Sequence, residues 1–319
     1  MAELRTLGAS GLATPPFILG GNVFGWTADE TESFRILDAF VAAGGTMIDT
    51  ADVYSSWAPG NKGGESETVI GRWLAARGRR DDVLIATKVG FMGGLSAAAI
   101  GRGIDGSLRR LGTDYVDLYY AHRDDEEAPL EETLEAFDRL VRAGKARALG
   151  ASQIEAARLD RALDISAANG WTGYSVLQTW YNLLDRPRFE EALGPLALRR
   201  GLGVATFYSL ANGYLTGKYR SAADLAKSPR GDRVQPYLEG SGPVVLAAID
   251  EVAGDLGATP AQVALAWTAA QPGVTAPLAS ATSVAQLEEL LGAVDLRLTA
   301  AHLARLDEAS RAAGASEPL

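Results

Sequence analysis

The strongest constraint on the fold is a pattern that repeats along nearly the whole chain. A helical stretch leads into a glycine-rich or charged turn, and a short apolar run follows. Seven such junctions occur, at AAGGTMID, RGRRDDVLIATK, RLGTDYVDLYYAH, RAGKARALGAS, ANGWTGYSVLQT, RRGLGVATFYS and QPGVTAPLAS. The earlier run PFILGG, at 16–21, brings the candidate strands to eight. Each is too short for a helix and too uniformly apolar for a half-exposed sheet, which is typical of buried parallel strands.

Eight buried parallel strands with amphipathic helices between them predict an α/β fold, a closed (β/α)8 TIM barrel. We expect the first helix to begin at Thr27, with Glu30 completing a capping box, and to stop at Gly44 and Gly45. It should turn inward Phe34, Leu37, Phe40 and Val41. An open doubly wound sheet is the alternative, but the turn LGGNVFG lacks the GxGxxG spacing of such folds.

Two segments lie outside the repeat. The stretch LRTLGASGLATPP predicts an N-terminal β-hairpin around Gly8 to Gly11 that plugs the lower end of the barrel. The long segment from Asn212 to Gly242 follows strand seven and is rich in glycine, proline and charge. Loops of that length usually act as lids or binding loops. We expect a single domain over residues 1–319.

Composition removes several classes of function. The 319 residues include no cysteine and only two histidines, His122 and His302, so a metal centre is not expected. A net charge of −10 disfavours nucleic acid as a partner. Neither a leader peptide nor an apolar run near the roughly 20 residues of a membrane helix is apparent. We therefore expect a cytoplasmic protein with a small-molecule partner and no membrane association; its oligomeric state stays open.

Four side chains that handle protons lie at or just beyond the predicted strand ends. Asp49 ends strand two, Tyr54 follows five residues later, Lys88 ends strand three and His122 ends strand four. The carboxyl ends of barrel strands form the active face, so these four residues are expected to meet there. A buried ammonium needs a carboxylate partner, for which Asp49 is the obvious candidate.

The chemistry of this group points to proton transfer through a tyrosine. An ammonium beside Tyr54 is expected to lower the pKa of its hydroxyl and make it a usable acid and base. His122 can donate a hydrogen bond to the same substrate oxygen. Such a site can protonate a carbonyl oxygen or deprotonate an alcohol, and it lacks only a hydride carrier, which a nicotinamide cofactor supplies.

Longer blocks of sequence resemble the aldo-keto reductase family. These are MIDTADVY with GESETVIG, LRRLGTDYVDLYYAHRDD, RAGKARALGAS and YSLANGYLTGKY, in the family's order over nearly the whole chain. The resemblance implies that the protein is an NAD(P)-dependent oxidoreductase, reducing an aldehyde or ketone to an alcohol or catalysing the reverse. It implies a catalytic tetrad of Asp49, Tyr54, Lys88 and His122, with Tyr54 as proton donor.

The same resemblance implies cofactor contacts. Ser152, Gln153 and Gln178 would hold the nicotinamide carboxamide, although the family usually has asparagine where this chain has Gln153. Tyr208 would stack on the nicotinamide ring. In the loop after strand seven, the contacts would come from Ser209, Leu210, Gly213 and Lys218. In the last cofactor block, APLASATSVAQLEEL, they would come from Ser280, Thr282 and Gln286. Ordinary alternatives are a helix cap for Ser152, a backbone contact for Gln178 and a core position for Tyr208.

The form of the cofactor is less constrained. Many family members carry a basic residue for the adenosine 2′-phosphate and an asparagine for adenine, and here those places are Thr282 and Leu290. Hydroxyls at Ser280, Thr282 and Ser283 stand at a helix start, where phosphate or ribose can bind. Arg230 or Arg233 can compensate for the missing basic residue. NADPH is favoured from the family, and NADH is possible.

Aromatic residues after strands one and two suggest a pocket for apolar or ring-bearing carbonyl compounds. Its expected wall comprises Val23, Phe24, Trp26, Trp57 and Arg123, with Trp180 and Tyr181. Arg123 can bind a substrate carboxylate or pair with Asp124 or Asp125.

Two other functions are alternatives to a reductase: a cofactor-binding regulatory barrel without significant turnover, and a barrel glycosidase. The glycosidase would need two carboxylates across the active face, and strand seven ends without one.

Overall fold

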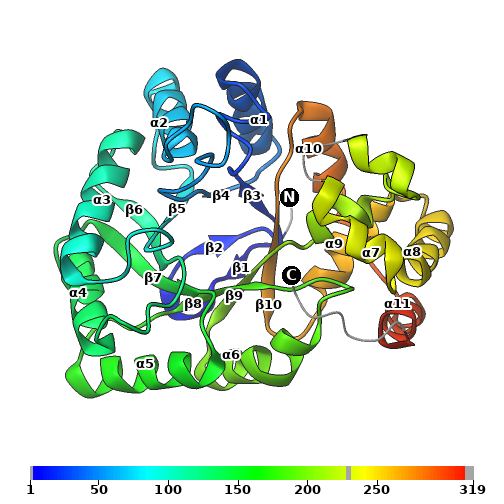
Figure 1. Ribbon diagram of the computed structural model, residues 1–319. Helices are drawn as coiled ribbons and strands as arrows, with labels where there is room; N and C mark the ends of the chain where they lie inside the picture. Colours follow the sequence, from blue (N-terminus) through cyan, green and yellow to red (C-terminus); the bar gives the residue numbers. More distant parts are fainter. Residues whose placement is uncertain (1–2, 228–230, 313–319) are drawn as a thin grey trace.

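The computed structural model describes residues 3–227 and 231–312, in which eight parallel strands close into a barrel (Figure 1). The strand order around the barrel is β10-β3-β4-β5-β6-β7-β8-β9. The strands are β3 (Ile18–Gly20), β4 (Met47–Asp49), β5 (Leu84–Val89), β6 (Val116–Ala121), β7 (Ala146–Ser152), β8 (Val176–Trp180), β9 (Gly203–Phe207) and β10 (Val274–Ala279). The predicted (β/α)8 fold is therefore confirmed.

Helices surround the barrel and cover the outer faces of its strands (Figure 1). They are α1 (Glu30–Ala42), α2 (Glu65–Arg77), α3 (Ala97–Leu111), α4 (Leu130–Arg142), α5 (Ala156–Asn169), α6 (Gly194–Arg200), α7 (Gln235–Glu239), α8 (Gly242–Leu256), α9 (Pro260–Ala269), α10 (Val284–Leu291) and α11 (Ala300–Ala312). A π-helical turn, η2 (Phe189–Leu193), precedes α6. The loop after β9 contains the 3-10 turns η3 (Ala211–Thr216), η4 (Ala222–Lys227) and η5 (Gly231–Arg233).

The start of the first helix differs from the expected one. Asp29, not Thr27, is the N-cap of α1, and its carboxylate accepts the Glu32 backbone N–H at 2.8 Å. Both residue types cap helices well, so only the path of the chain distinguishes them. The helix buries Ile36, Leu37 and Phe40, whereas Phe34 and Val41 are partly exposed. It ends at Ala42, and Gly44 takes up the left-handed conformation just beyond, with φ 86°.

The predicted N-terminal plug is present. Strands β1 (Arg5–Thr6) and β2 (Ala13–Thr14) pair antiparallel around the 3-10 turn η1 (Gly8–Ser10). This turn packs against β7, β8 and β9. A Cβ at Gly8 would lie 2.3 Å from the Gly203 backbone nitrogen, so only glycine allows the turn to approach β9 so closely. The hairpin closes the end where the strands begin and leaves the other end for a site.

The interior of the barrel is filled by side chains from alternate strand positions. Met47, Ala86, Tyr120, Val176 and Ala205 belong to one buried cluster that also includes residues of the hairpin and of the other strands. The intervening strand residues pack outward beneath the helices. Because side chains alternate along a strand, the residues two positions after these interior residues also point inward, one layer nearer the carboxyl ends.

Candidate functional site

The period of two along the strands brings the predicted site residues into one layer. Asp49 lies two positions after Met47, Lys88 two after Ala86, and Gln178 two after Val176. All three side chains are buried, with exposed fractions of 1%, 0% and 3%. His122 follows the last residue of β6 directly, and Tyr54 lies on the loop after β4. The four proton-handling residues therefore converge at the carboxyl end of the barrel.

Lys88 is the centre of this group. Its ammonium donates to Asp49 Oδ1 at 2.5 Å, to the Thr50 carbonyl at 2.8 Å and to the Tyr54 hydroxyl oxygen at 2.8 Å. The Tyr54 hydroxyl in turn donates to Asp49 Oδ1 at 3.2 Å. A buried ion pair needs such additional hydrogen bonds to offset the desolvation of both charges. Asp49, Lys88 and Tyr54 thus form one connected network.

Gln178 completes the network in a way that the sequence did not indicate. Its side-chain amide donates to Asp49 Oδ2 at 2.8 Å, while Lys88 occupies Oδ1. Both oxygens of the carboxylate are therefore held, and Asp49 has no freedom to rotate away from Lys88. We interpret Gln178 in this structure as a residue that positions Asp49.

The pKa of the Tyr54 hydroxyl shifts in the direction opposite to the expected one. Burial and the negative charge of Asp49 raise this pKa well above 10, so the prediction of a lowered value is wrong for this state. Burial lowers the pKa of Lys88, and Asp49 opposes that shift. Tyr54 consequently keeps its proton at neutral pH. It is poised as a donor, with the Lys88 ammonium in place to stabilise a phenolate once the proton leaves.

His122 follows β6, two strands along the barrel from β4, and its ring faces that of Tyr54. The two rings lie 5.9 Å apart, edge to face, with an interplanar angle of 75°. Burial, with the positive charges of Lys88 and Arg123, lowers the pKa of His122 well below 6.5. The imidazole is therefore neutral at pH 7, and it can donate one N–H to a carbonyl oxygen placed beside Tyr54.

A second buried charged group lies behind Lys88. The Glu67 carboxylate accepts from the Thr87 hydroxyl at 2.5 Å and from Arg110 Nε at 2.7 Å, and it is fully buried. Asp52 Oδ1 is buried without a hydrogen-bond partner among the described residues. Burial, followed by the Glu67 charge, raises the pKa of Asp52 to about 6. Sequence analysis missed this group, although Glu67 lies within the GESETVIG block.

The residues predicted for the carboxamide occupy the adjoining strand ends. Ser152 ends β7 and is 1% exposed, and its hydroxyl makes no hydrogen bond with another described residue. Gln153 instead donates from its amide to the His122 carbonyl at 3.2 Å. Its backbone has φ 47°, a left-handed conformation that asparagine adopts more readily than glutamine.

The loop after β9 begins with Tyr208, whose ring lies 4.3 Å from that of Trp180. Arg233 Nη1 reaches the Tyr208 hydroxyl at 3.5 Å; Arg230 lies outside the described residues. The Ser209 hydroxyl is held internally, 2.9 Å from the Thr206 carbonyl. Further along, Leu210 is partly buried, Gly213 has φ 93°, and the exposed Lys218 ammonium lies over the Tyr219 ring at 4.9 Å.

The last predicted cofactor block forms the start of α10. The Ser280 hydroxyl donates to Asn22 Oδ1 at 2.5 Å. Gln286 Oε1 accepts both the backbone N–H and the hydroxyl of Thr282 at 2.9 Å. One carboxylate already lies here, because Glu32 of α1 accepts the Val284 backbone N–H at 3.2 Å. This carboxylate places negative charge at the helix start where a 2′-phosphate was expected.

The predicted substrate wall is only partly open. Phe24, Val23 and Tyr181 are buried at 0%, 2% and 0% exposure and pack in the hydrophobic core cluster. Trp26 and Trp57 pack edge to face at 5.6 Å, and Trp57 also contacts Tyr54 at 6.0 Å. Trp57 is 46% exposed.

Two exposed apolar residues in the loop after β5 had not been predicted for this region. Phe91 and Met92 are 38% and 79% exposed, and the Phe91 ring lies 5.0 Å from that of His122. The sequence signal was available in LIATKVGFM, directly after Lys88.

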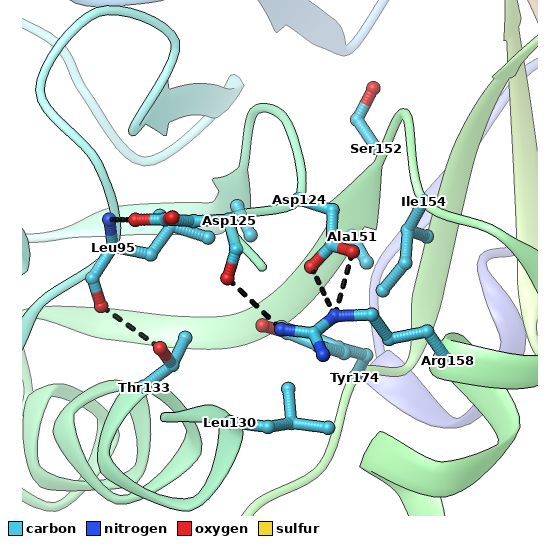
Figure 2. Close-up of a pocket in the computed structure, with 11 residues that line it drawn as sticks. Leu95, Asp124, Asp125, Leu130, Thr133, Ala151, Ser152, Ile154, Arg158 and Tyr174 are labelled. Carbon is cyan, nitrogen blue, oxygen red and sulfur yellow. Dashed lines mark hydrogen bonds and ion pairs between the residues drawn. The ribbon is translucent and has the colours of Figure 1, made fainter. Parts of the chain in front are cut away.

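The loops behind His122 are fixed by a clamp around a small cavity of about 10 Å³ (Figure 2). Arg158 donates to the Asp124 carboxylate at 2.7 Å and to the Asp125 carbonyl at 3.0 Å. The Asp125 carboxylate accepts the Leu95 backbone N–H at 2.8 Å. The Ser152 side chain points away from this cavity in Figure 2. The cavity has room for about one water molecule, so it is part of the scaffold and not a substrate pocket.

The described residues contain no group of three or more histidine, cysteine, aspartate or glutamate residues arranged to hold a metal ion. Among the described helices, none is long and apolar enough to cross a membrane.

Comparison with known proteins identifies the family. Residues 16–311 match the model of the "Aldo/keto reductase family". The chain is 35% identical to the "Uncharacterized oxidoreductase YrpG" of Bacillus subtilis, over 99% of this chain and 98% of that protein. It is 33% identical to a "Probable voltage-gated potassium channel subunit beta" of Arabidopsis thaliana, over 92% of both chains. It is 32% identical to "Aldo-keto reductase str7" of Strobilurus tenacellus, over 86% of this chain and 80% of that protein. The chain therefore belongs to the aldo-keto reductase family, a family of oxidoreductases that act on carbonyl compounds.

Proposed function

We propose that the protein reduces an aldehyde or ketone to an alcohol, or catalyses the reverse reaction, with NAD(P)H as hydride donor and Tyr54 as proton donor. The observation that carries this proposal is the Tyr54 hydroxyl, 2.8 Å from the Lys88 ammonium, on a ring whose centroid lies 5.9 Å from that of the neutral His122. A protonated tyrosine backed by a buried ammonium is suited to giving its proton to a carbonyl oxygen.

Each residue has a defined part in this mechanism. His122 donates an N–H to the carbonyl oxygen of the substrate and orients it toward Tyr54. A nicotinamide cofactor held at the ends of β7, β8 and β9 would supply the hydride that the carbonyl carbon receives. The Tyr54 proton passes to the oxygen, and Lys88 stabilises the phenolate that remains. Asp49, held by Gln178, keeps the Lys88 ammonium in place. One hydride and one proton thus convert the carbonyl to the alcohol.

The strand ends opposite Tyr54 fit a nicotinamide. The Ser152 hydroxyl makes no hydrogen bond with the described protein and can accept from or donate to a carboxamide. Tyr208, which follows β9, offers an aromatic ring backed by Trp180. The Gln178 amide oxygen would accept from the carboxamide while its N–H stays on Asp49, and Gln153 would reach the carboxamide after exchanging its present partner. The loop with Ser209, Leu210, Gly213 and Lys218 would follow the pyrophosphate, where Lys218 supplies a positive charge.

We propose NADPH as the preferred form and NADH as a weaker alternative. Family membership favours NADPH, and Thr282, Gln286 and Ser280 can hydrogen-bond a phosphate or a ribose. The described part of this block contains no arginine or lysine, and Glu32 adds a negative charge, so the discrimination should be small.

The relatives named as potassium channel subunits suggest a second candidate function, a cofactor-binding regulatory barrel without significant turnover. The two functions differ in one measurement. The protein is mixed with NADPH and 4-nitrobenzaldehyde, and the absorbance near 340 nm is followed. Its loss supports the reductase, whereas NADPH binding without turnover of any aldehyde or ketone supports the regulatory barrel.

Replacement of Tyr54 by phenylalanine tests the mechanism. The variant keeps the ring and its contact with Trp57 but loses the proton, so turnover should fall by about 10²–10⁴-fold. NADPH binding, followed by quenching of tryptophan fluorescence, should be unchanged. Tyr115→Phe is the matched control, because Tyr115 lies just before β6 at the opposite end of the barrel. Wild-type turnover by the Tyr54 variant would refute the assigned role.

A further inference from the structure

Arg123 is an exposed cation at the edge of the candidate site. It directly follows His122, and its positive charge contributes to the lowered pKa of that histidine. Within the described part of the chain, its guanidinium makes no ion pair. Exposed arginines on this protein are often paired; Arg188, for example, contacts Glu155 at 2.7 Å.

The acidic neighbours of Arg123 are already engaged elsewhere. Asp124 is held by Arg158 at 2.7 Å, and Asp125 accepts backbone N–H groups of Leu95, Glu127 and Ala128 (Figure 2). These contacts direct both carboxylates into the clamp behind the loop. Neither aspartate therefore forms the internal ion pair with Arg123 that the sequence left open.

The position of the guanidinium relative to the reacting groups is defined by aromatic rings. It lies over Phe91, with Cζ 5.6 Å from the ring centroid, and the same ring lies 5.0 Å from the ring of His122. The Phe91 ring therefore lies next to both the Arg123 guanidinium and the His122 imidazole. A ring-bearing substrate whose carbonyl oxygen meets His122 and Tyr54 can pack along Phe91 and extend toward the guanidinium.

We propose that Arg123 selects carbonyl substrates that carry a carboxylate across an aromatic or similarly sized apolar spacer. This inference rests on the proposed reductase function and specifies its substrate class. A guanidinium binds a carboxylate through two parallel N–H···O bonds, and here it lies over the Phe91 ring, 5.6 Å from the centroid. A singly charged carboxylate suits this chain better than a phosphate, because the net charge of −10 repels a dianion more strongly.

The test compares 4-carboxybenzaldehyde with neutral 4-nitrobenzaldehyde in the wild type, Arg123→Gln and Arg123→Lys. Arg123→Gln should lower kcat/KM for the carboxylated aldehyde, through KM, by about tenfold more than it lowers kcat/KM for the neutral aldehyde. Arg123→Lys should recover part of the loss, since it keeps the charge without the fork. Arg139→Gln is the control for the loss of one positive charge, because Arg139 lies exposed near the C-terminal end of α4, far from the site.

A binding measurement separates this inference from the reductase proposal. Benzoate, which has no carbonyl to reduce, is titrated against the NADP⁺-loaded wild type and Arg123→Gln by saturation-transfer NMR. Weaker benzoate binding to the variant supports the role of Arg123 even if neither aldehyde is turned over, which would refute only the reductase. Equal effects of Arg123→Gln on both aldehydes, or no effect on the carboxylated aldehyde and on benzoate, would overturn the inference.

Discussion

Asp52 provides a direct test of the electrostatics around Lys88. Its Oδ1 is buried and unpaired among the described residues, and Glu67 places a second negative charge close by. Burial and Glu67 together raise the pKa of Asp52 to about 6, although Arg110, Lys88 and the Val53 backbone N–H oppose the shift. At neutral pH the folded protein therefore holds an unfavourable carboxylate at this position.

The sign and size of the effect follow from proton linkage. An unfolded aspartate titrates near pH 3.9, so the folded state binds this proton more tightly. The stabilising contribution of Asp52 is fully present below about pH 4 and is lost as the pH rises through about 6. Shifting the pKa by about 2 units corresponds to roughly 3 kcal/mol, so ionised Asp52 destabilises the fold by about that amount at pH 8.

Replacement of Asp52 by asparagine removes this cost while keeping the shape. The free energy of unfolding, measured in urea by circular dichroism and fluorescence, should exceed that of the wild type by about 3 kcal/mol at pH 8. The advantage should shrink to about 1 kcal/mol at pH 4.5. Asp124→Asn is the control and should be destabilised at pH 8, because it breaks the ion pair with Arg158. A gain for Asp52→Asn that does not change with pH, or a loss at pH 8, would refute the argument.

Two further predictions concern the network and the cofactor. Asp49→Asn and Lys88→Met should each cost about 3–5 kcal/mol of unfolding free energy, because each leaves the other charge buried alone, while the double variant should cost clearly less than their sum. Urea unfolding of the four proteins measures this cycle, and additive costs would contradict a mutually dependent pair. Glu32→Gln should tighten NADPH binding by about three- to fivefold and leave NADH nearly unchanged, because it removes a negative charge at the start of α10. Dissociation constants from fluorescence titration provide the check, and equal changes for both cofactors would exclude a role in discrimination.

The barrel could be predicted from the sequence because its signal is repeated. Eight apolar runs, each preceded by a turn, leave few other arrangements for buried parallel strands. The cap of α1 could not be predicted equally well. Thr27 and Asp29 are both suitable residues, and only the path of the loop from Gly25 decides that Asp29 reaches the Glu32 N–H.

The convergence of Asp49, Lys88 and His122 could also be predicted, since barrel topology alone brings strand ends together. The contact between Gln178 and Asp49 could not, because the two residues lie 129 positions apart and either could have turned to another partner. The burial of Phe24 could not be predicted for a related reason. On a loop no fixed alternation tells which side chain points inward, and this one packs into the core with 0% exposure.

Backbone strain gives an independent indication of where function resides. In the described ranges, non-glycine residues with positive φ are Ser55, Gln153, Tyr208, Ala211 and Asn212. All five lie in loops that follow β4, β7 and β9, at the carboxyl end of the barrel, and the plug end of the described chain contains none. Such conformations cost about 1–3 kcal/mol each and persist where the surroundings determine them. The left-handed turn at Gln153 directs its amide to the His122 carbonyl, and the one at Tyr208 carries the ring that packs on Trp180. The strain is thus concentrated on the side chains that border Tyr54 and the proposed nicotinamide position, which is where a site gains most from fixed geometry.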